Sequence, residues 1–407
     1  MLSILTIITI LIILLCVDIY RKCTFSVTSI VILFYLLVAI AGIFVYKERA
    51  YTNLNFFPSL YFAFICFIFF LPLMSKRSLV VNGFHIQKTR SLSVVLIVYV
   101  LFAFFNIIDQ LNFLKSALIG GNFAALKQMA YGGEISLRNG FFWLVSRTYV
   151  SSLWMAVMLY GFYILKDDNQ PFLKGFSYIL LGILPEFITC IVYTYRGGIG
   201  VIALLVISAY FLFKNVYSLK RKIQLRVLFI ILFLLLLSII IAITVSRFGD
   251  AGAGSSFVSY LGQSMINFNA NVASRIHSFA NGKYFFANFY NMTVDDVCRD
   301  YLYGIESNNG ANLHTFVGNL VLDFGFIGGV IAALTSSTIS FLILCNKRKY
   351  DFADASFLMF YISFLCTGAF HSKCGFSFDC MAFFTIYAIL KISNLKFKLG
   401  SIHDTRY

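Results

Sequence analysis

The sequence carries little charge for its length. Only 12% of its 407 residues are charged, while 60% are hydrophobic and the mean hydropathy is +0.86. A soluble protein of this size has far more charge, because its surface must face water. The composition therefore excludes a soluble globular protein and predicts a polytopic membrane protein. Its 47 Phe and 24 Tyr suit lipid-facing and interfacial positions.

Several motifs are also missing. The nine cysteines show neither CxxC nor Cys/His metal spacing, and Asp295–Asp296 is an adjacent pair without the DxD spacing of a metal site. The first apolar run lacks both a basic region before it and a small-residue cleavage site after it, so we expect no cleavable signal peptide. No internal repeat is present. The sequence predicts no metal and no cofactor.

The net charge of +15 does not indicate a nucleic-acid partner. The basic residues stand in short clusters between apolar runs, which is the pattern that sets membrane topology and not that of a phosphate-binding face. We therefore expect the lipid bilayer, and no nucleic acid, as the surroundings of this chain.

A helix needs about 20 apolar residues to cross a bilayer. On this basis we predict an all-α integral membrane protein with about eleven transmembrane helices, in a single polytopic domain over 1–407. The predicted spans are about 2–20, 26–46, 56–74, 91–108, 141–165, 172–194, 197–213, 225–245, 315–345, 353–371 and 376–392.

Most of the 32 Lys and Arg residues fall on one side if eleven helices alternate. The largest clusters are Arg21–Lys22, Lys76–Arg90, Lys214–Arg226 and Lys347–Lys349. Basic loops stay in the cytoplasm. The N-terminus is therefore expected outside and the C-terminus inside.

Two long segments then lie outside, at about 109–140 and 246–314. The first contains a stretch that fits a short helix on the membrane surface, with glycine turns. The second is the largest polar part of the chain, and its glycine/serine stretch FGDAGAGSS predicts a flexible start.

Arg196 is the first candidate binding residue. It lies in TYRGGIG on the outer side, where topology gives no reason for an arginine. The glycines after it allow close backbone approach at a helix N-terminus, a good place to hold a phosphate. The alternative is an arginine that snorkels to the membrane interface.

Further arginines follow the same logic. Arg147 lies inside a predicted span, where a charge needs a partner or a water-filled cavity, and Glu186 lies at a comparable depth in the next helix. We expect a structural ion pair for Glu186 and leave the role of Arg147 open. Arg247 and Arg275 face the outer compartment as candidate anion ligands, or are simply solvated.

His314 stands where the large outer segment enters the next apolar helix. Its near-neutral pKa suits proton transfer from a sugar hydroxyl, although a helix cap is the plainer role and His277 is a competing base. Gly318, Gly325 and Gly329 would lie about 40°, 20° and 60° from it around a regular helix. Asp323 would lie on the opposite face, at about 180°, as a packing or cavity group.

The residues from His314 onward resemble a pattern of the O-antigen polymerase and O-antigen ligase superfamily. In that pattern an acidic residue follows the leading histidine at nine, as Asp323 does, and glycines follow at eleven and fourteen, as Gly325 and Gly328 do. Thr315 stands where family members usually have asparagine.

Two further segments share the resemblance. TYRGGIG is similar to the family's Ser-Arg-Gly segment at a helix start, with Tyr195 in place of serine. Arg299 and Gly310 match an Arg-x10-Gly pattern described for such polymerases. The architecture, with many helices and a large outer loop late in the chain, is similar over most of the chain, whereas the motifs cover only a short part of it.

The resemblance implies a metal-independent glycosyltransferase of GT-C-like architecture in a bacterial inner membrane. A Wzy-type polymerase of this superfamily transfers the growing glycan from undecaprenyl pyrophosphate to a lipid-linked repeat unit on the periplasmic face. The resemblance implies His314 for the acceptor and Arg196 for the leaving group, with Arg147, Arg247, Arg275 and Arg299 binding pyrophosphate or sugar. A flippase and a chain-length regulator would be partners.

Two alternatives stay open. An O-antigen ligase performs the same chemistry with lipid A core as the acceptor, and the motifs barely separate the two. A polysaccharide flippase or transporter belongs to another class, and would need ion-coupling acids near the bilayer midplane and matching broken helices in two halves of the chain.

Overall fold

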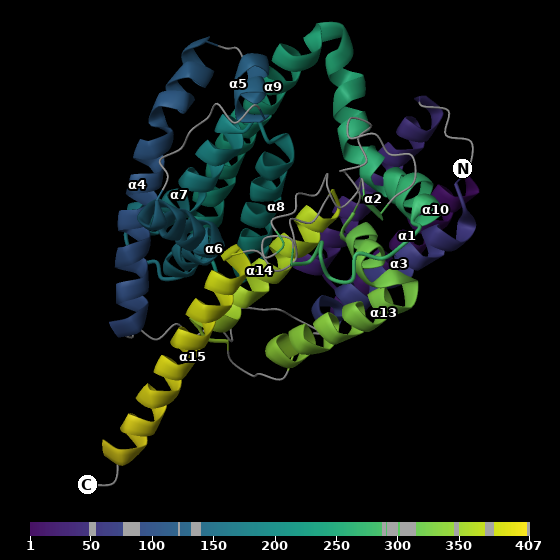
Figure 1. The fold of residues 1–407 in the computed structure, drawn as a ribbon. Helices are drawn as coiled ribbons and strands as arrows, with labels where there is room; N and C mark the ends of the chain where they lie inside the picture. Colours follow the sequence, from purple (N-terminus) through teal and green to yellow (C-terminus); the bar gives the residue numbers. More distant parts are fainter. Residues whose placement is uncertain are drawn as a thin grey trace. The chain divides into compact units, whose positions relative to one another are not determined.

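The computed structural model describes residues 1–48, 54–75, 90–120, 123–131, 140–286, 290, 300–301, 315–345, 350–370 and 378–404. This part of the chain is helical, without β-strands (Figure 1). Helices suit the sequence because a backbone in lipid has no water to bond and must satisfy its polar groups within the segment. The predicted all-α class is confirmed for these residues.

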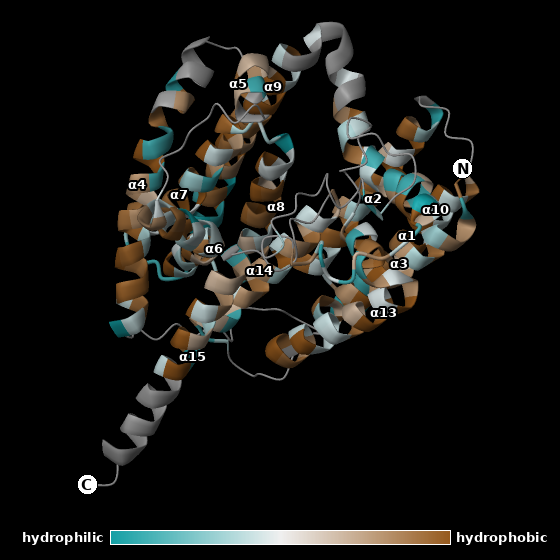
Figure 2. Cartoon of the chain, viewed as in Figure 1, coloured by the Kyte–Doolittle hydropathy of each residue, from teal (hydrophilic) through white to brown (hydrophobic). Residues whose placement is uncertain are grey.

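Nine helices of this part are long and apolar enough to cross a membrane. Figure 2 shows hydrophobic residues along much of α4, for example. The chain thus has the character of a multi-pass membrane protein, and the count of eleven spans remains a prediction. The nine helices are α1 (Leu2–Lys22), α2 (Val27–Glu48), α3 (Phe56–Met74), α4 (Arg90–Gly120), α6 (Phe141–Ile164), α7 (Phe172–Val192), α8 (Arg196–Phe213), α9 (Leu219–Asn267) and α13 (Phe316–Cys345).

The last two predicted spans also form helices, α14 (Phe352–Gly368) and α15 (Phe378–Asp404). Of these, α14 is apolar but only 17 residues long. In the first long outer segment, α4 continues to Gly120 and is followed by the short helix α5 (Phe123–Tyr131).

In the second segment predicted to lie outside, α9 continues well past the predicted start of the loop. It is interrupted at Gly249, whose φ of 70° and ψ of 169° are not helical. The stretch predicted as a flexible start is therefore helical on both sides of Gly249, since each glycine in a helix costs only about 1 kcal/mol. A π-helical turn η2 (Phe268–Val272) and the short α10 (Ala273–Arg275) follow α9.

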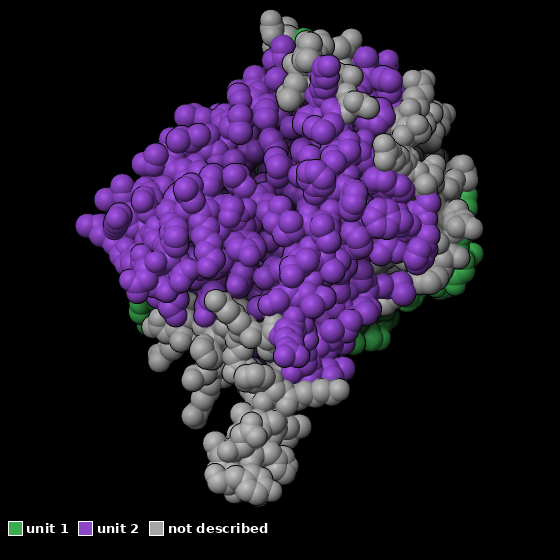
Figure 3. All heavy atoms as spheres, turned by 90° about the vertical axis from the view of Figure 1, so that its left-hand side faces the viewer, with its two compact units in different colours: residues 1–79, 248–346, 361–377 green, residues 80–247, 347–360, 378–407 purple. Residues whose placement is uncertain are grey.

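The chain divides into two compact units, coloured separately in Figure 3. Each is assembled from segments far apart in the sequence. Unit 1 consists of Met1–Leu79, Phe248–Asn346 and Tyr361–Ser377, and unit 2 of Val80–Arg247, Lys347–Phe360 and Phe378–Tyr407.

In unit 1, α3 packs against α13. Pro72 lies inside α3 and has no N–H, so the carbonyl of Ile68 loses its helical donor. The hydroxyl of Ser337 from α13 donates to this carbonyl at 2.7 Å. The rings of Phe69 and Phe316 meet edge to face with centroids 4.9 Å apart. The proline therefore helps to fix how the two helices pair.

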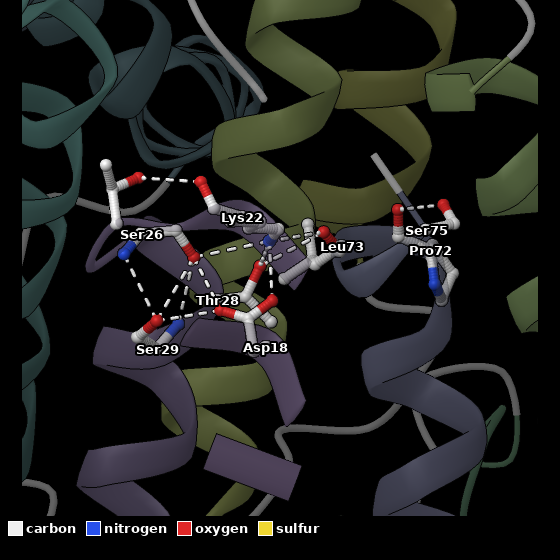
Figure 4. A network of polar contacts seen from close by, with 9 residues as sticks. Asp18, Lys22, Ser26, Thr28, Ser29, Pro72, Leu73 and Ser75 are labelled. Atoms are coloured by element: carbon white, nitrogen blue, oxygen red, sulfur yellow. Dashed lines mark hydrogen bonds and ion pairs between the residues drawn. The ribbon is translucent and has the colours of Figure 1, made fainter. Parts of the chain in front are cut away.

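A buried ion pair ties α1 to α2 and α3 (Figure 4). Asp18 and Lys22 lie one turn apart on α1, and their side chains are 0% and 2% exposed, with Oδ1 and Nζ 2.7 Å apart. Lys22 also donates to the Thr28 hydroxyl at 2.7 Å and to the Leu73 carbonyl at 3.0 Å. Asp18 Oδ2 accepts hydrogen bonds of 2.7 Å each from the hydroxyls of Ser26 and Ser29.

We call this ion pair the Asp18–Lys22 clamp. It reduces the weight of one basic cluster as evidence for membrane topology. Lys22 belongs to the cluster that the topology prediction used, yet its charge is buried and neutralised by Asp18. An ion pair of zero net charge is a weak topology signal. Lys22 is therefore a structural lysine, and Arg21 is the residue of this pair left to act as a topology signal.

In unit 2, α7 contains Pro185 within its length. It leaves the Leu181 carbonyl without its helical donor. The hydroxyl of Tyr99 from α4 donates to the carbonyls of Leu181 at 3.3 Å and Gly182 at 3.2 Å. The Tyr99 hydroxyl thus satisfies the carbonyl freed by Pro185, as the Ser337 hydroxyl satisfies the carbonyl freed by Pro72 in unit 1.

Candidate functional site

Helix α13 begins at Phe316 and is interrupted nine residues later, at Gly325. Gly325 has a φ of 68° and a ψ of −178°, a conformation open essentially only to glycine. A break of this kind frees carbonyl groups of the preceding turn. The carbonyls of Leu322 and Asp323 accept the backbone N–H groups of Ala280 and Asn281, both at 2.9 Å.

The residues that approach this break form a tight turn. Asn281 and Gly282 have φ of 52° and 85°, and the N–H of Lys283 donates to the Ala280 carbonyl at 3.0 Å. Two left-handed residues at the centre of such a turn are the type I′ pattern, which Asn-Gly favours. The turn therefore has a local cause in the sequence.

The Asp323 side chain holds the end of this turn. Its carboxylate accepts the N–H of Tyr284 at 2.9 Å and of Phe285 at 2.6 Å. Asp323 is 2% exposed. We call residues 280–286, Asp323 and Gly325 the Asp323 latch, because backbone and side-chain bonds together fix the segment on α13.

Residues near the latch carry polar and cationic groups. The Lys283 ammonium lies 5.8 Å from the centre of the Tyr301 ring, and the nearby Tyr301 hydroxyl raises the pKa of Lys283 above its usual value. The N–H of His277 donates to the Tyr301 carbonyl at 3.3 Å, and His277 Nδ1 lies 3.1 Å from the Ser278 hydroxyl. Arg275, a predicted binding residue, is exposed at the end of α10.

The break at Gly325 corrects one expectation. Gly318, Gly325 and Gly329 were expected to share a face of one regular helix, but the helical register does not continue across Gly325. The helix that packs on Gly329 is α3, through the Tyr61 side chain. Asp323 points to the segment at 282–285, so it is a packing group, as expected, but for a loop and not for a helix.

Arg196 in unit 2 begins α8 at a sharp corner. The N–H of Thr194 donates to the Ile191 carbonyl at 3.0 Å and that of Tyr195 to the Cys190 carbonyl at 2.7 Å. These two bonds end α7 in a Schellman motif. Thr194 has a φ of 50°, which is unusual for a β-branched residue and costs about 1–3 kcal/mol.

The Arg196 side chain is buried beside the corner that it follows. The residue is 6% exposed, and Nη1 donates to the Thr244 hydroxyl of α9 at 3.1 Å. A Cβ at Gly198 would lie 2.5 Å from Cys190 Sγ and from the Tyr195 ring, so only glycine fits there. The glycines of TYRGGIG thus allow the corner to close, and α8 directs its N-terminal N–H groups to the same place.

Arg147, on α6, is half-buried, and its Nε donates to the Trp143 carbonyl at 3.3 Å. Its guanidinium and the Asp109 carboxylate both interact electrostatically with Tyr193, the residue that ends α7. Glu186 interacts with Tyr99. Arg147 of α6 and Asp109 of α4 therefore lie near the end of α7, close to the residues that lead to Arg196.

The structure leaves several predicted residues without a described position. His314 and Arg299 lie outside the described residues. Arg247 is part of the backbone of α9, with no described side chain. Arg196 and Arg147 belong to unit 2, and Arg275 belongs to unit 1. The predicted roles of these residues stay predictions.

Lys283 was not among the residues predicted to bind substrate. The signal that could have found its turn is the Asn281–Gly282 dipeptide. As for metals, no group of three or more His, Cys, Asp or Glu in the described part of the chain could hold an ion.

Comparison with known proteins adds no relative: no family model, no curated protein and no solved structure matches this chain.

Proposed function

We propose that this protein is a metal-independent glycosyltransferase of the bacterial inner membrane, an O-antigen or oligosaccharide repeat-unit polymerase. It transfers the growing glycan from undecaprenyl pyrophosphate to the sugar of another lipid-linked repeat unit, on the periplasmic face. Its helices, GT-C-like in arrangement, give the lipid carrier a membrane-embedded path.

The observation that carries the proposal is the corner at Arg196. A departing pyrophosphate needs fixed positive charge where its own charge develops. Arg196 is buried, held by Thr244, and placed at the first residue of α8 after the strained Thr194. A guanidinium at a helix N-terminus joins two features that favour phosphate oxygens.

The acceptor side of the reaction rests on His314, which takes the proton of the attacking sugar hydroxyl. Arg147, Arg247, Arg275 and Arg299 bind the pyrophosphate or the sugars. A flippase supplies the substrate on the outer face, and a chain-length regulator acts as a partner. The resemblance of the sequence pattern supports these roles.

A deletion strain tests the proposal and separates it from its nearest rival. Loss of a polymerase leaves lipopolysaccharide with a single repeat unit, whereas loss of a ligase leaves none. We expect the single-unit form, restored to a ladder by the wild-type gene. A normal ladder in the deletion strain would contradict the proposal.

Substitutions in the same strain test the site. Arg196→Ala and His314→Ala should each lower polymer synthesis about 10²–10³-fold, the range for removing one group that stabilises the transition state. Arg196→Lys should restore little, because lysine lacks the planar fork of arginine. Arg226→Ala, which changes an exposed arginine of α9, is the matched control. Full synthesis by the two alanine variants at normal protein level would remove both residues from the site.

A further inference from the structure

We propose that Asp323 is a positioning residue, which holds the segment 277–286 against α13 so that His277 and Lys283 are placed for the lipid-linked substrate. This inference rests on the proposed function for its substrate. The Asp323 latch is inferred from hydrogen bonds in the structure alone, so it can be tested without measuring any reaction.

The chemistry of the latch requires a carboxylate. An ionised aspartate has two acceptor oxygens and no donor, so both can receive N–H groups. Tyr284 donates to Oδ1 and Phe285 to Oδ2. Asparagine would turn an NH2 group toward an N–H and leave at least one buried donor unsatisfied.

The break at Gly325 provides a second set of contacts to the same segment, through backbone carbonyls of α13. The freed carbonyls of Leu322 and Asp323 accept N–H groups from Ala280 and Asn281. A Cβ at position 325 would come within 2.8 Å of the Phe279 ring. The carbonyls of Leu322 and Asp323, the Asp323 carboxylate and Gly325 therefore all contact one short segment. These are more contacts than are needed to satisfy the free carbonyl groups of a helix end.

The held segment is also where polar groups gather outside the membrane-length helices. Lys283 extends from the latched turn to Tyr301, and His277 lies three residues before the turn, with its N–H on the Tyr301 carbonyl. A cation and an imidazole fixed on one rigid segment suit an anionic sugar carrier, because binding then orders little of the protein. Asp323 is buried and reaches the substrate only through this segment.

The first test is hydrogen exchange of the backbone amides in the purified full-length protein. Asp323→Asn should speed exchange in a peptide covering 280–286 about tenfold to hundredfold, the equivalent of losing one buried hydrogen bond. A peptide from 330–344 of α13 should keep its rate. Asp379→Asn is the matched control, because Asp379 accepts a side-chain hydroxyl, that of Ser151, at 2.6 Å. Unchanged exchange at 280–286 would overturn the latch, whatever the protein's reaction.

The second test is kinetic, with lipid-linked repeat units as the probe. Asp323→Asn and Lys283→Met should each raise the KM for this substrate, and the double variant should be no worse than the worse single one, because both act through one segment. A merely structural Asp323 would lower the yield of folded protein and leave KM unchanged. Faster exchange with unchanged KM, or fully additive effects, would overturn the positioning role. If the wild-type protein lengthens no glycan, the proposed function and the positioning role fail, while the exchange result still decides the latch.

Discussion

Asp18 and Asp323 are two buried carboxylates in the described membrane-length helices of unit 1, and their partners differ in kind. Asp18 is bonded by side chains: the Lys22 ammonium and two serine hydroxyls. Asp323 is bonded by backbone N–H groups of a turn that lies outside the membrane-length helices in the sequence. The first carboxylate joins neighbouring helices, and the second fixes a segment that bears His277 and Lys283.

The difference predicts how each site tolerates substitution. A clamp made of two side chains can be replaced by two neutral side chains of similar size. A latch made on backbone amides has no such second side chain to replace, because every residue type except proline keeps its N–H. Buried charge therefore marks a structural feature at Asp18 and a candidate functional one at Asp323.

The largest expected effect is that of Lys22→Met. It leaves the Asp18 carboxylate buried without its ammonium, which should lower the free energy of unfolding by about 3–5 kcal/mol. Thermal unfolding in detergent and the yield of membrane-inserted protein measure the loss.

The double variant Asp18→Asn/Lys22→Met sharpens the comparison. Replacing a buried ion pair by neutral side chains is often neutral or stabilising, so most of the lost stability should return. If the double variant is as unstable as Lys22→Met, the clamp is not a self-contained pair. A stable Lys22→Met single variant would contradict the account of the pair directly.

The next effect compares the two glycine breaks. Gly325 and Gly249 have almost the same φ and ψ, yet a Cβ at Gly249 would meet nothing within 4 Å. Gly325→Ala should cost about 2–4 kcal/mol, from backbone strain and displacement of the Phe279 ring. Gly249→Ala should cost only the backbone part, about 1–3 kcal/mol.

Thermal unfolding midpoints of the two glycine variants measure this difference, and hydrogen exchange locates it. Exchange at 280–286 should rise in Gly325→Ala and stay unchanged in Gly249→Ala. Adding Phe279→Ala to Gly325→Ala should recover part of the loss. Equal effects of both glycine variants on exchange at 280–286 would contradict the claim that the break at Gly325, unlike that at Gly249, holds this segment.

Much of the architecture can be predicted from the sequence, because apolar runs of about 20 residues are a strong local signal. The prediction fails where local and tertiary effects compete. The stretch FGDAGAGSS contains three glycines, yet α9 continues through it with a single break, at Gly249. The break at Gly325 cannot be read from a periodicity that assumes a regular helix.

The site is predictable in part. An arginine followed by glycines predicts a helix start, and α8 begins at Arg196. That Asp323 bonds backbone groups about 40 residues earlier depends on how the chain returns to α13, and no local pattern encodes it. The Asn281–Gly282 turn is a local signal, but its docking on α13 is not.

The smallest effect is expected for Tyr61→Phe. The Tyr61 hydroxyl donates to the Phe326 carbonyl at 2.9 Å, just after the break in α13. Its loss should cost about 0.5–1.5 kcal/mol, the value of one neutral hydrogen bond. The thermal unfolding midpoint should fall slightly while exchange at 280–286 stays the same. Increased exchange there would show that α3 contributes to the latch.

The proposed reaction is tested most directly with the purified protein in liposomes, supplied only with undecaprenyl-pyrophosphate-linked repeat units. Gel electrophoresis of the released glycans then reports their length. The account predicts a ladder of glycans longer than one repeat unit, formed without added metal ion and strongly reduced in Arg196→Ala. Glycans that stay one repeat unit long with folded wild-type protein would contradict it.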